Sequence, residues 1–460
     1  MIKTKVGFVI YGVHKDGITD NLGTPHMNPK LFEKCKDAIR KHDIELVEEE
    51  VIVATKAEAI AAMGKLKKDD EIDAVILFSG TWVWSGYLVG AVQDFARTGK
   101  PIVIWTHPGS QGWRNVGGLV MHAALMELGI NHRFVHGAYD DEEQIEKIVS
   151  YLRAASVKNK LNLSTVGTFG GRGMGQSCGV ADPSQWMKTF GVDIDSRDTY
   201  QLIECAKNIT EEEIKALEPR LIKLFGGLPV DNEVSDHSIR LYLAIKKMMK
   251  EYGFDYYTIQ SFPGIGDDYS GTCFAQSMIL EDGIGTSTLC DFNTLMTTIL
   301  LTELSEERVY YGDLQNINRE NKEIKIIGDG ACPPSLAGKL DPAVYATHDV
   351  PTEGKKDSIA VQLTCKPGKG VLAHLGRRDG QFEMIVARCE VFEPKPEDLQ
   401  RRKEECGTPF WPHGFVTVEG DMDDFIEGWN NEYACLGYGE HLYDEIVAFC
   451  EQTGIKVIKI

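Results

Sequence analysis

Three features are missing from this sequence: cysteines with CxxC spacing, an uninterrupted apolar run near the ~20 residues of a membrane span, and an excess of positive charge. The eleven cysteines are scattered. Their spacing argues against a structural zinc site and is typical of a reducing compartment, where thiols act as small hydrophobic groups. The first residues, MIKTKVGFVIYG, begin a strand at once, so we expect no signal peptide. We expect a cytoplasmic protein with no membrane partner.

The charge balance is strongly acidic. The 49 Lys and Arg residues stand against 69 Asp and Glu residues, which gives a formal net charge of −20. This balance argues against nucleic acid and anionic membranes as partners. With 460 residues, of which 43% are hydrophobic and 26% charged, the chain predicts a globular protein of two or three domains.

A complete phosphate-binding loop is also missing. Glycines 170, 171, 173 and 175 follow a predicted strand at Thr165–Phe169, but no GxxxxGK[ST] occurs and the spacing does not match GxGxxG. The pattern therefore favours a tight strand-to-helix turn over a phosphate site.

Alternation of short apolar strands with amphipathic helices predicts an α/β fold. Over residues 1–160 five strands alternate with helices, which requires parallel pairing in a doubly wound sheet. Residues 161–345 repeat this alternation, whereas residues 346–460 contain Gly-separated segments that alternate as antiparallel strands do. We predict two doubly wound parallel-sheet α/β domains followed by a β-rich C-terminal domain.

Two carboxylates flank a helical pattern in the second domain. Asp291 precedes the apolar recurrence of Thr294–Leu304, and Asp313 follows the strand pattern Val309–Tyr311. Strand tips and adjoining helix starts share the ligand-binding edge of an open α/β sheet, so the pair could bind a divalent cation or move a proton. A helix N-cap and a strand-end turn explain the same residues equally well.

Polar and aromatic residues at other predicted strand tips are candidates for sugar binding. Trp82 follows a strand of the first domain, and Gln260 follows Tyr256–Ile259. An indole stacks well on the apolar face of a sugar, although packing explains a loop tryptophan at least as well.

The chain resembles the L-fucose isomerase and L-arabinose isomerase superfamily over most of its length. The residues that carry the resemblance are GGRGMG…ADPSQW…FGVDIDSRD (170–198), Cys273…Ser277…LEDG (280–283), LCDFN (289–293), YGD (311–313), WPH (411–413) and the final DEIVAFCEQTGIKVI. The resemblance implies a fucose isomerase-like subunit in a homo-oligomer, a trimer or hexamer. It also implies Mn²⁺ and interconversion of an aldose with its ketose through an enediol, in which a cation polarises the sugar oxygens and paired carboxylates move the proton.

This sequence departs from the family pattern at the metal ligands. The family Glu falls on Asp291, the neighbouring family Asp on Asn293, and the second family Asp is kept as Asp313. The family His falls on Tyr433, with Glu432 beside it, and His413 or His441 could take over its role. The resemblance thus implies Asp291, Asp313 and Tyr433 as catalytic residues and Asp291, Asp313 and Glu432 as metal ligands. The expected substrate-binding residues are Trp82, Arg172, Gln260, Asn293 and His413.

The replaced ligands point to an altered subtype. The substrate could be a pentose or a deoxy or modified hexose, possibly sulfonated, with Arg172, Arg377 or Arg378 facing the anionic group. A surface charge explains Arg377 and Arg378 better than this role does. Two alternatives stay open: another carbohydrate-active enzyme with a changed or absent metal site, and a non-catalytic sugar-binding protein.

Overall fold

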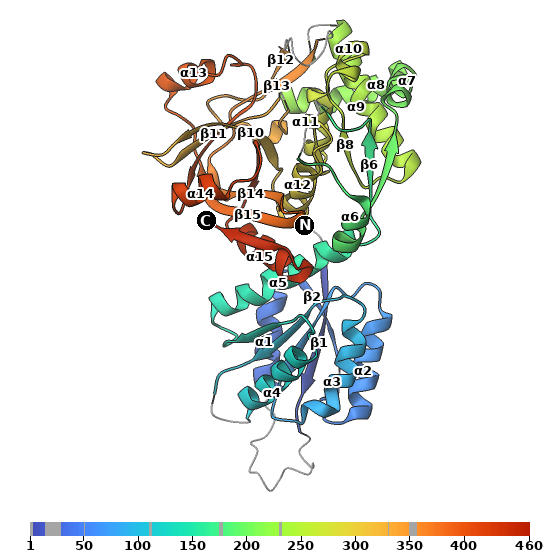
Figure 1. The fold of residues 1–460 in the computed structure, drawn as a ribbon, viewed down its shortest axis with the longest axis vertical. Coiled ribbons are helices and arrows are strands. Elements are labelled where there is room, and N and C mark those ends of the chain that lie inside the picture. Colours follow the sequence, from blue (N-terminus) through green and yellow to red (C-terminus); the bar gives the residue numbers. More distant parts are fainter. Residues whose placement is uncertain are drawn as a thin grey trace. The chain divides into compact units, whose positions relative to one another are not determined.

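The computed structural model describes residues 3–13, 29–49, 51–109, 113–173, 178–229, 232–329, 331–348 and 357–460 (Figure 1). The chain divides into two compact units. The first is Met1–Lys160 with Val447–Thr453, and the second is Leu161–Ile446 with Gly454–Ile460. The division into three domains, with a boundary after residue 345, stays a prediction. No described helix has the length and apolar character needed to cross a membrane.

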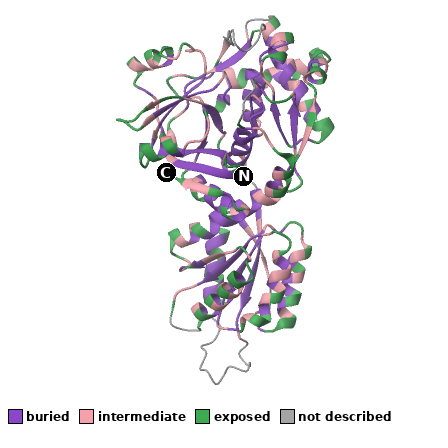
Figure 2. Ribbon diagram, in the orientation of Figure 1, coloured by how far each residue is buried: buried purple, intermediate pink, exposed green. Residues whose placement is uncertain are grey.

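The first unit is a doubly wound parallel sheet, as predicted. Its strand order is β2-β1-β3-β4-β5, with every neighbouring pair parallel. The strands are β1 (Thr4–Tyr11), β2 (Ile44–Glu48), β3 (Ala74–Ser79), β4 (Ile102–Thr106) and β5 (Arg133–His136). The helices are α1 (Pro29–Arg40), α2 (Lys56–Lys68), α3 (Ser85–Ala96), α4 (Arg114–Glu127) and α5 (Glu142–Leu161). Strands β3 and β4 are buried along their whole length because helices carry the chain back over both faces (Figure 2).

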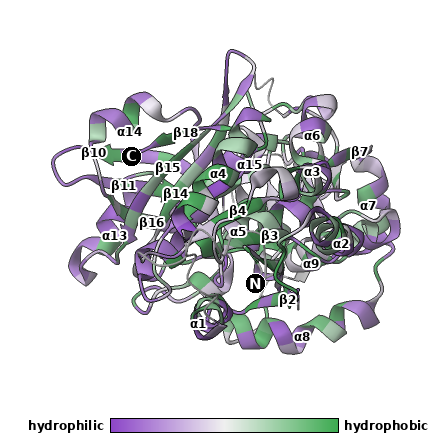
Figure 3. Ribbon diagram, turned by 90° about the horizontal axis from the view of Figure 1, so that it is seen from below, coloured by the Kyte–Doolittle hydropathy of each residue, from purple (hydrophilic) through white to green (hydrophobic). Residues whose placement is uncertain are grey.

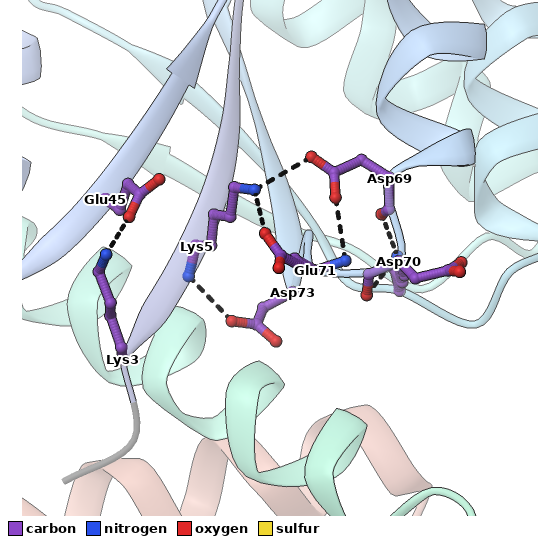
Figure 4. Close-up of polar contacts among 8 residues, drawn as sticks. Lys3, Lys5, Glu45, Asp69, Asp70, Glu71 and Asp73 are labelled. Atoms are coloured by element: carbon purple, nitrogen blue, oxygen red, sulfur yellow. Dashed lines mark hydrogen bonds and ion pairs between the residues drawn. The ribbon is translucent and has the colours of Figure 1, made fainter.

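Charged residues attach the start of β1 to the turn before β3. The Lys5 amide donates to Asp73 at 2.9 Å, and its ammonium contacts Asp69 at 3.2 Å and Glu71 at 2.6 Å (Figure 4). Lys3 pairs with Glu45 on the neighbouring strand. Because most of these groups are exposed, the ion pairs orient the strand more than they stabilise the unit.

The second unit contains a smaller parallel sheet with the order β7-β6-β8-β9. Its strands are β6 (Thr165–Phe169), β7 (Asp193–Arg197), β8 (Tyr256–Ile259) and β9 (Thr286–Ser287). The helices around it are α6 (Pro183–Phe190), α7 (Thr199–Lys207), α8 (Glu211–Phe225), α9 (Asn232–Tyr252), α10 (Gly264–Asp268), α11 (Cys273–Glu281) and α12 (Phe292–Leu304). Surface helix α8 alternates hydrophilic and hydrophobic residues (Figure 3), whereas α12 is buried nearly all round.

The rest of the second unit is a barrel of antiparallel strands. Its strands are β10 (Tyr310–Asn318), β11 (Glu323–Ile327), β14 (Gly368–Arg378), β15 (Gln381–Val391), β16 (His413–Val418) and β17 (Tyr433–Tyr438). The order β14-β17-β10-β11-β16-β15 closes because β14 also pairs with β15, and β18 (Lys456–Lys459) adds to β15 in parallel. Strands β12 (Val344–His348) and β13 (Ser358–Gln362) form a separate pair. The remaining helices of this unit are η2 (Pro334–Leu336), α13 (Pro396–Glu404) and α14 (Met422–Gly428), whereas α15 (Leu442–Thr453) belongs to the first unit from Val447 onward.

The barrel corrects one expectation about the carboxylates. The strand that carries Asp313 is β10 of the barrel, paired antiparallel with β11 and β17, and does not belong to the parallel sheet. Asp291 and Asp313 therefore do not share the edge of one α/β sheet. Helix α12, which begins after Asp291, packs against β9 and also against β14 and β17, so it joins the two sheets.

Candidate functional site

Asp291 is the N-cap of α12. Its Oδ1 accepts hydrogen bonds from the amides of Asn293 and Thr294, both at 2.9 Å, and its side chain is wholly buried. The two preceding residues, Leu289 and Cys290, have φ of 57° and 53°, in the left-handed region. Two consecutive non-glycine residues in that region are a strained approach of the kind that gathers at functional sites. The helix-cap interpretation of Asp291 is thus confirmed, and the approach to it is unusual.

The glycine-rich segment covers this carboxylate. Between the end of β6 at Phe169 and the start of α6 at Pro183 the structure describes residues 170–173 and 178–182, so the predicted tight turn lies partly outside the described residues. The Gly173 amide donates to Leu289 O at 3.2 Å. Gly179 accepts from the Phe292 amide at 2.8 Å and has φ of +74°. A Cβ at Gly179 would lie 2.6 Å from Asp291 Oδ1, so only glycine fits there.

One short segment connects both predicted carboxylates. Asn431 donates from Nδ2 to Asp291 Oδ2 at 3.2 Å and accepts at Oδ1 from the Tyr433 amide at 3.0 Å. Tyr433 in turn lies directly opposite Asp313 in the β10–β17 pair. The structure thus links Asp291 to Asp313 through Asn431 and Tyr433.

Tyr433, Asp313 and His413 lie in one row across the barrel. Asp313 pairs with Tyr433 on one side and with Ile327 on the other, and Ile327 pairs with His413. Directly opposed residues project from the same face of a sheet, so the three side chains share a face. Two strand spacings separate Asp313 from His413, which places their Cα atoms roughly 10 Å apart.

Tyr433 is a protonated phenol. Its side chain is 3% exposed, and burial, with smaller contributions from Asp329 and Asp313, raises its pKa well above the ordinary value. Its ring meets that of Tyr311 edge-on at 6.1 Å. Asp313 is half-buried, so it is the more accessible of the two predicted carboxylates. A neutral O–H donor beside an accessible carboxylate is a combination suited to general acid–base chemistry.

His413 is a neutral, buried imidazole. Burial, followed by the charges of Lys325 and Lys403, lowers its pKa to about 3. Neither ring nitrogen has a hydrogen-bond partner among the described residues, and the ring stacks on Phe415 at 6.1 Å. Its position two strands from Asp313 gives no support to the idea that it replaces the family imidazole beside the carboxylates.

His374 on β14 is the residue that the sequence analysis missed. Its Nε2 lies 3.1 Å from Thr294 Oγ1 and its Nδ1 lies 3.3 Å from Asn430 Oδ1, which fits a neutral ring that donates from Nδ1 and accepts at Nε2. Burial lowers its pKa, and the charge of Asp291 opposes that shift. The only signal was a lone histidine in the apolar run GVLAHLG, which is more often a core residue.

One arginine lies among these acidic groups. Arg377 on β14 donates to the Val180 carbonyl. The pKa of neighbouring Cys178 is raised by burial, then by Glu432 and Asp291, and is lowered by Arg377. Glu432, Asp291 and Arg377 therefore all lie close enough to Cys178 to shift its pKa. Arg378 instead pairs with Glu383 at 3.1 Å, as a surface charge does.

The other predicted substrate-binding residues are dispersed. Gln260 uses its side-chain oxygen to accept from the Gly171 amide at 3.1 Å, and Arg172 is exposed in the same loop. Asn293 is buried in the first turn of α12. Trp82 belongs to the first unit, where its ring lies 4.5 Å from that of Trp84.

The described donors do not fit a metal ion. Among the described residues, no group of three or more His, Cys, Asp and Glu side chains could hold one. Asp291 directs its oxygens to three N–H donors, which compete with any cation for its lone pairs. The ligand set Asp291, Asp313 and Glu432 thus stays a prediction made from the resemblance.

The chain was compared with models of protein families, with known proteins and with solved structures. No model of a protein family matches the chain. The chain is 25% identical over 385 residues to a sulfoquinovose isomerase of Clostridium sp. (strain MSTE9), which covers 80% of this chain and 82% of that protein. A periplasmic solute binding protein of an ABC transporter from Actinobacillus succinogenes 130z, with bound D-allose, is 12% identical over 61% of this chain and 83% of that one. Its TM-score of 0.18 is too low to carry an argument.

Proposed function

We propose that this protein is an aldose–ketose isomerase of the L-fucose and L-arabinose isomerase superfamily that acts on a sulfonated hexose. The similarity to a sulfoquinovose isomerase carries this proposal, because it extends over four fifths of both chains and cannot rest on one shared motif. In the structure, Asp313, Tyr433 and Arg377 lie around residues 430–433, and this arrangement supports the proposal.

Isomerisation requires a base, an acid and a polarising donor. A base removes the proton from C2 of the open-chain aldose, and the resulting enediol takes a proton at C1 while a proton moves from O2 to O1. In our proposal the Asp313 carboxylate carries the carbon-bound proton, because it is accessible. Tyr433 donates its phenol proton toward the sugar oxygens, because its raised pKa keeps it protonated. Asp291 holds Asn431 and the start of α12 in place.

Arg377 is the cation that we assign to the sulfonate. It is half-buried beside Val180 and Cys178, whereas Arg378 is exposed and already paired. An arginine fork suits the oxygens of a sulfonate. Arg377→Met is expected to raise KM for the sulfonated sugar by roughly tenfold or more, and Arg378→Met is the matched control.

Incubation with sulfoquinovose in D₂O, followed by NMR, tests the reaction. An enediol mechanism predicts a ketose that carries solvent deuterium at C1, and Asp313→Asn should lower kcat by roughly 10²–10⁴. Asp379→Asn, in an exposed turn, is the control. Conversion of glucose but not of sulfoquinovose would refute the substrate class, and conversion of neither would refute the isomerase.

We propose three further properties from the sequence alone: a trimeric or hexameric assembly, a cytoplasmic location and a requirement for Mn²⁺. Metal analysis and turnover before and after EDTA test the last one. The resemblance predicts that EDTA abolishes turnover and that Mn²⁺ restores it. Turnover that survives EDTA would leave Asp313 and Tyr433 as the sufficient catalytic groups.

A further inference from the structure

A buried arginine lies at the carboxyl edge of the first unit's sheet. Arg114 is the first residue of α4 and is 8% exposed. The loop that leads from β4 to α4 brings Gly109 close to it, since a Cβ at Gly109 would lie 2.9 Å from Arg114 Nη2. In open α/β sheets this edge, near the switch point between β1 and β3, is where ligands bind.

No described group compensates the charge of Arg114. Its Nε has no hydrogen-bond partner, and within the described ranges no carboxylate pairs with the guanidinium. The two ionisable groups whose pKa values are shifted by Arg114, the Cys35 thiol and the His107 imidazole, are both neutral. Burial raises the pKa of the Cys35 thiol to about 12, and burial also lowers the pKa of His107, an effect to which Arg114 adds. Buried charges in proteins are normally paired, so an unpaired one indicates a missing partner.

The surroundings of Arg114 suit a negative partner. Trp113, the N-cap of this 14-residue helix, provides no side-chain hydrogen bond to the first amides of α4. Trp113 also has φ of 52°. Together these groups present positive charge and N–H donors at one helix start.

We infer that this edge binds the oxyanion group, sulfonate or phosphate, of a small organic molecule. Arg114 provides the charge, and the first turn of α4 provides amide donors. The aromatic residues nearby suit a carbon skeleton: the Cβ position of Gly117, one turn along α4, lies 3.2 Å from Trp82 Cα, and Trp84 is 59% exposed. The inference concerns the first unit by itself and does not depend on the proposed isomerase.

Thermal unfolding in sulfate, methanesulfonate, phosphate or chloride at equal ionic strength tests this site. The wild type should gain about 5–10 °C in Tm when an anion is present at 100 times its Kd. Arg114→Met should lose that gain and should have a higher Tm than the wild type in chloride, because it removes an uncompensated buried charge. Arg97→Met, which changes an exposed arginine of the same unit, should respond as the wild type does.

The outcomes separate clearly. An equal anion response in wild type and Arg114→Met, or no response of the wild type beyond that in chloride, would overturn the inference. Preference for methanesulfonate over phosphate would identify a sulfonate site, and the reverse a phosphate site. If Arg114→Met fails to fold, calorimetric titration of Arg114→Lys with the preferred anion decides: a Kd at least tenfold weaker than that of the wild type supports the site, and an unchanged Kd refutes it.

Discussion

Exchanging the side chains at positions 291 and 431 tests whether the buried carboxylate of Asp291 positions its neighbours or takes part in the reaction. In Asp291→Asn, the new amide can still cap α12 with its oxygen, but its NH₂ then faces the NH₂ of Asn431. Asn431 cannot rotate its amide without losing the bond from the Tyr433 amide. The single change should cost about 1.5–3 kcal/mol, the usual loss for a hydrogen bond to a charged group. Asn431→Asp should also destabilise, because it places a second carboxylate at that 3.2 Å contact.

The double variant, Asp291→Asn with Asn431→Asp, restores every one of these bonds. The amide introduced at position 291 would cap α12 and donate to the carboxylate introduced at position 431, and that carboxylate would accept from the Tyr433 amide. We expect a coupling energy of about 1–3 kcal/mol in the double-mutant cycle, measured by urea unfolding. Hydrogen exchange of the peptide that contains the Asn293 and Thr294 amides gives a local measure of the same cap.

Turnover then assigns the role of Asp291. If Asp291 acts by holding Asn431, kcat should fall in Asp291→Asn and recover with stability in the double variant. Recovered stability with no recovered turnover would make Asp291 a chemical participant and refute the positioning role. Destabilisation of the double variant by the sum of the single changes would refute the hydrogen-bond geometry itself.

Three further outcomes follow from the second unit. His413 is neutral and buried, with a pKa of about 3 in the folded protein. Its contribution to the free energy of unfolding is complete above its unfolded pKa of about 6.5 and is lost as the pH falls toward 3. Between pH 8 and pH 5, urea titrations should therefore show that the wild type loses about 2 kcal/mol more than His413→Leu. Gly179→Ala should cost more stability and turnover than Gly380→Ala, because both glycines have positive φ (+74° and +76°) but only the first Cβ meets Asp291; equal losses would contradict the contact. Tyr433→Phe keeps the ring packing and should lower kcat by roughly 10² or more, with unchanged circular dichroism; unchanged kcat would remove the phenol from the reaction.

The sequence predicted most of the elements because their signals are local. The strand and helix alternation of residues 1–160 produced the parallel sheet that was expected, and the C-terminal segments are antiparallel strands. The cap at Asp291 was also foreseeable, since an aspartate before an apolar helical pattern satisfies the first amides. What failed was the partner of residues 310–318: a short apolar strand pairs equally well in a parallel sheet or a barrel.

The contacts within the candidate site were harder to predict from the sequence than the helices and strands were. Asp291, Asp313 and Tyr433 were identified through a resemblance, but no pattern in the sequence could link them through Asn431 or reveal His374 beside Thr294. Those contacts join residues that are 80 to 140 positions apart.

The sequence by itself determined the α/β and β-rich segments, the acidic surface and the residue types available for proton transfer. The tertiary structure decided which of them meet. Strand register places Tyr433 opposite Asp313, and the packing of α12 between two sheets buries Asp291 beneath Gly179. Register and burial depend on pairing between distant segments, where a shift of one residue would turn every side chain to the other face.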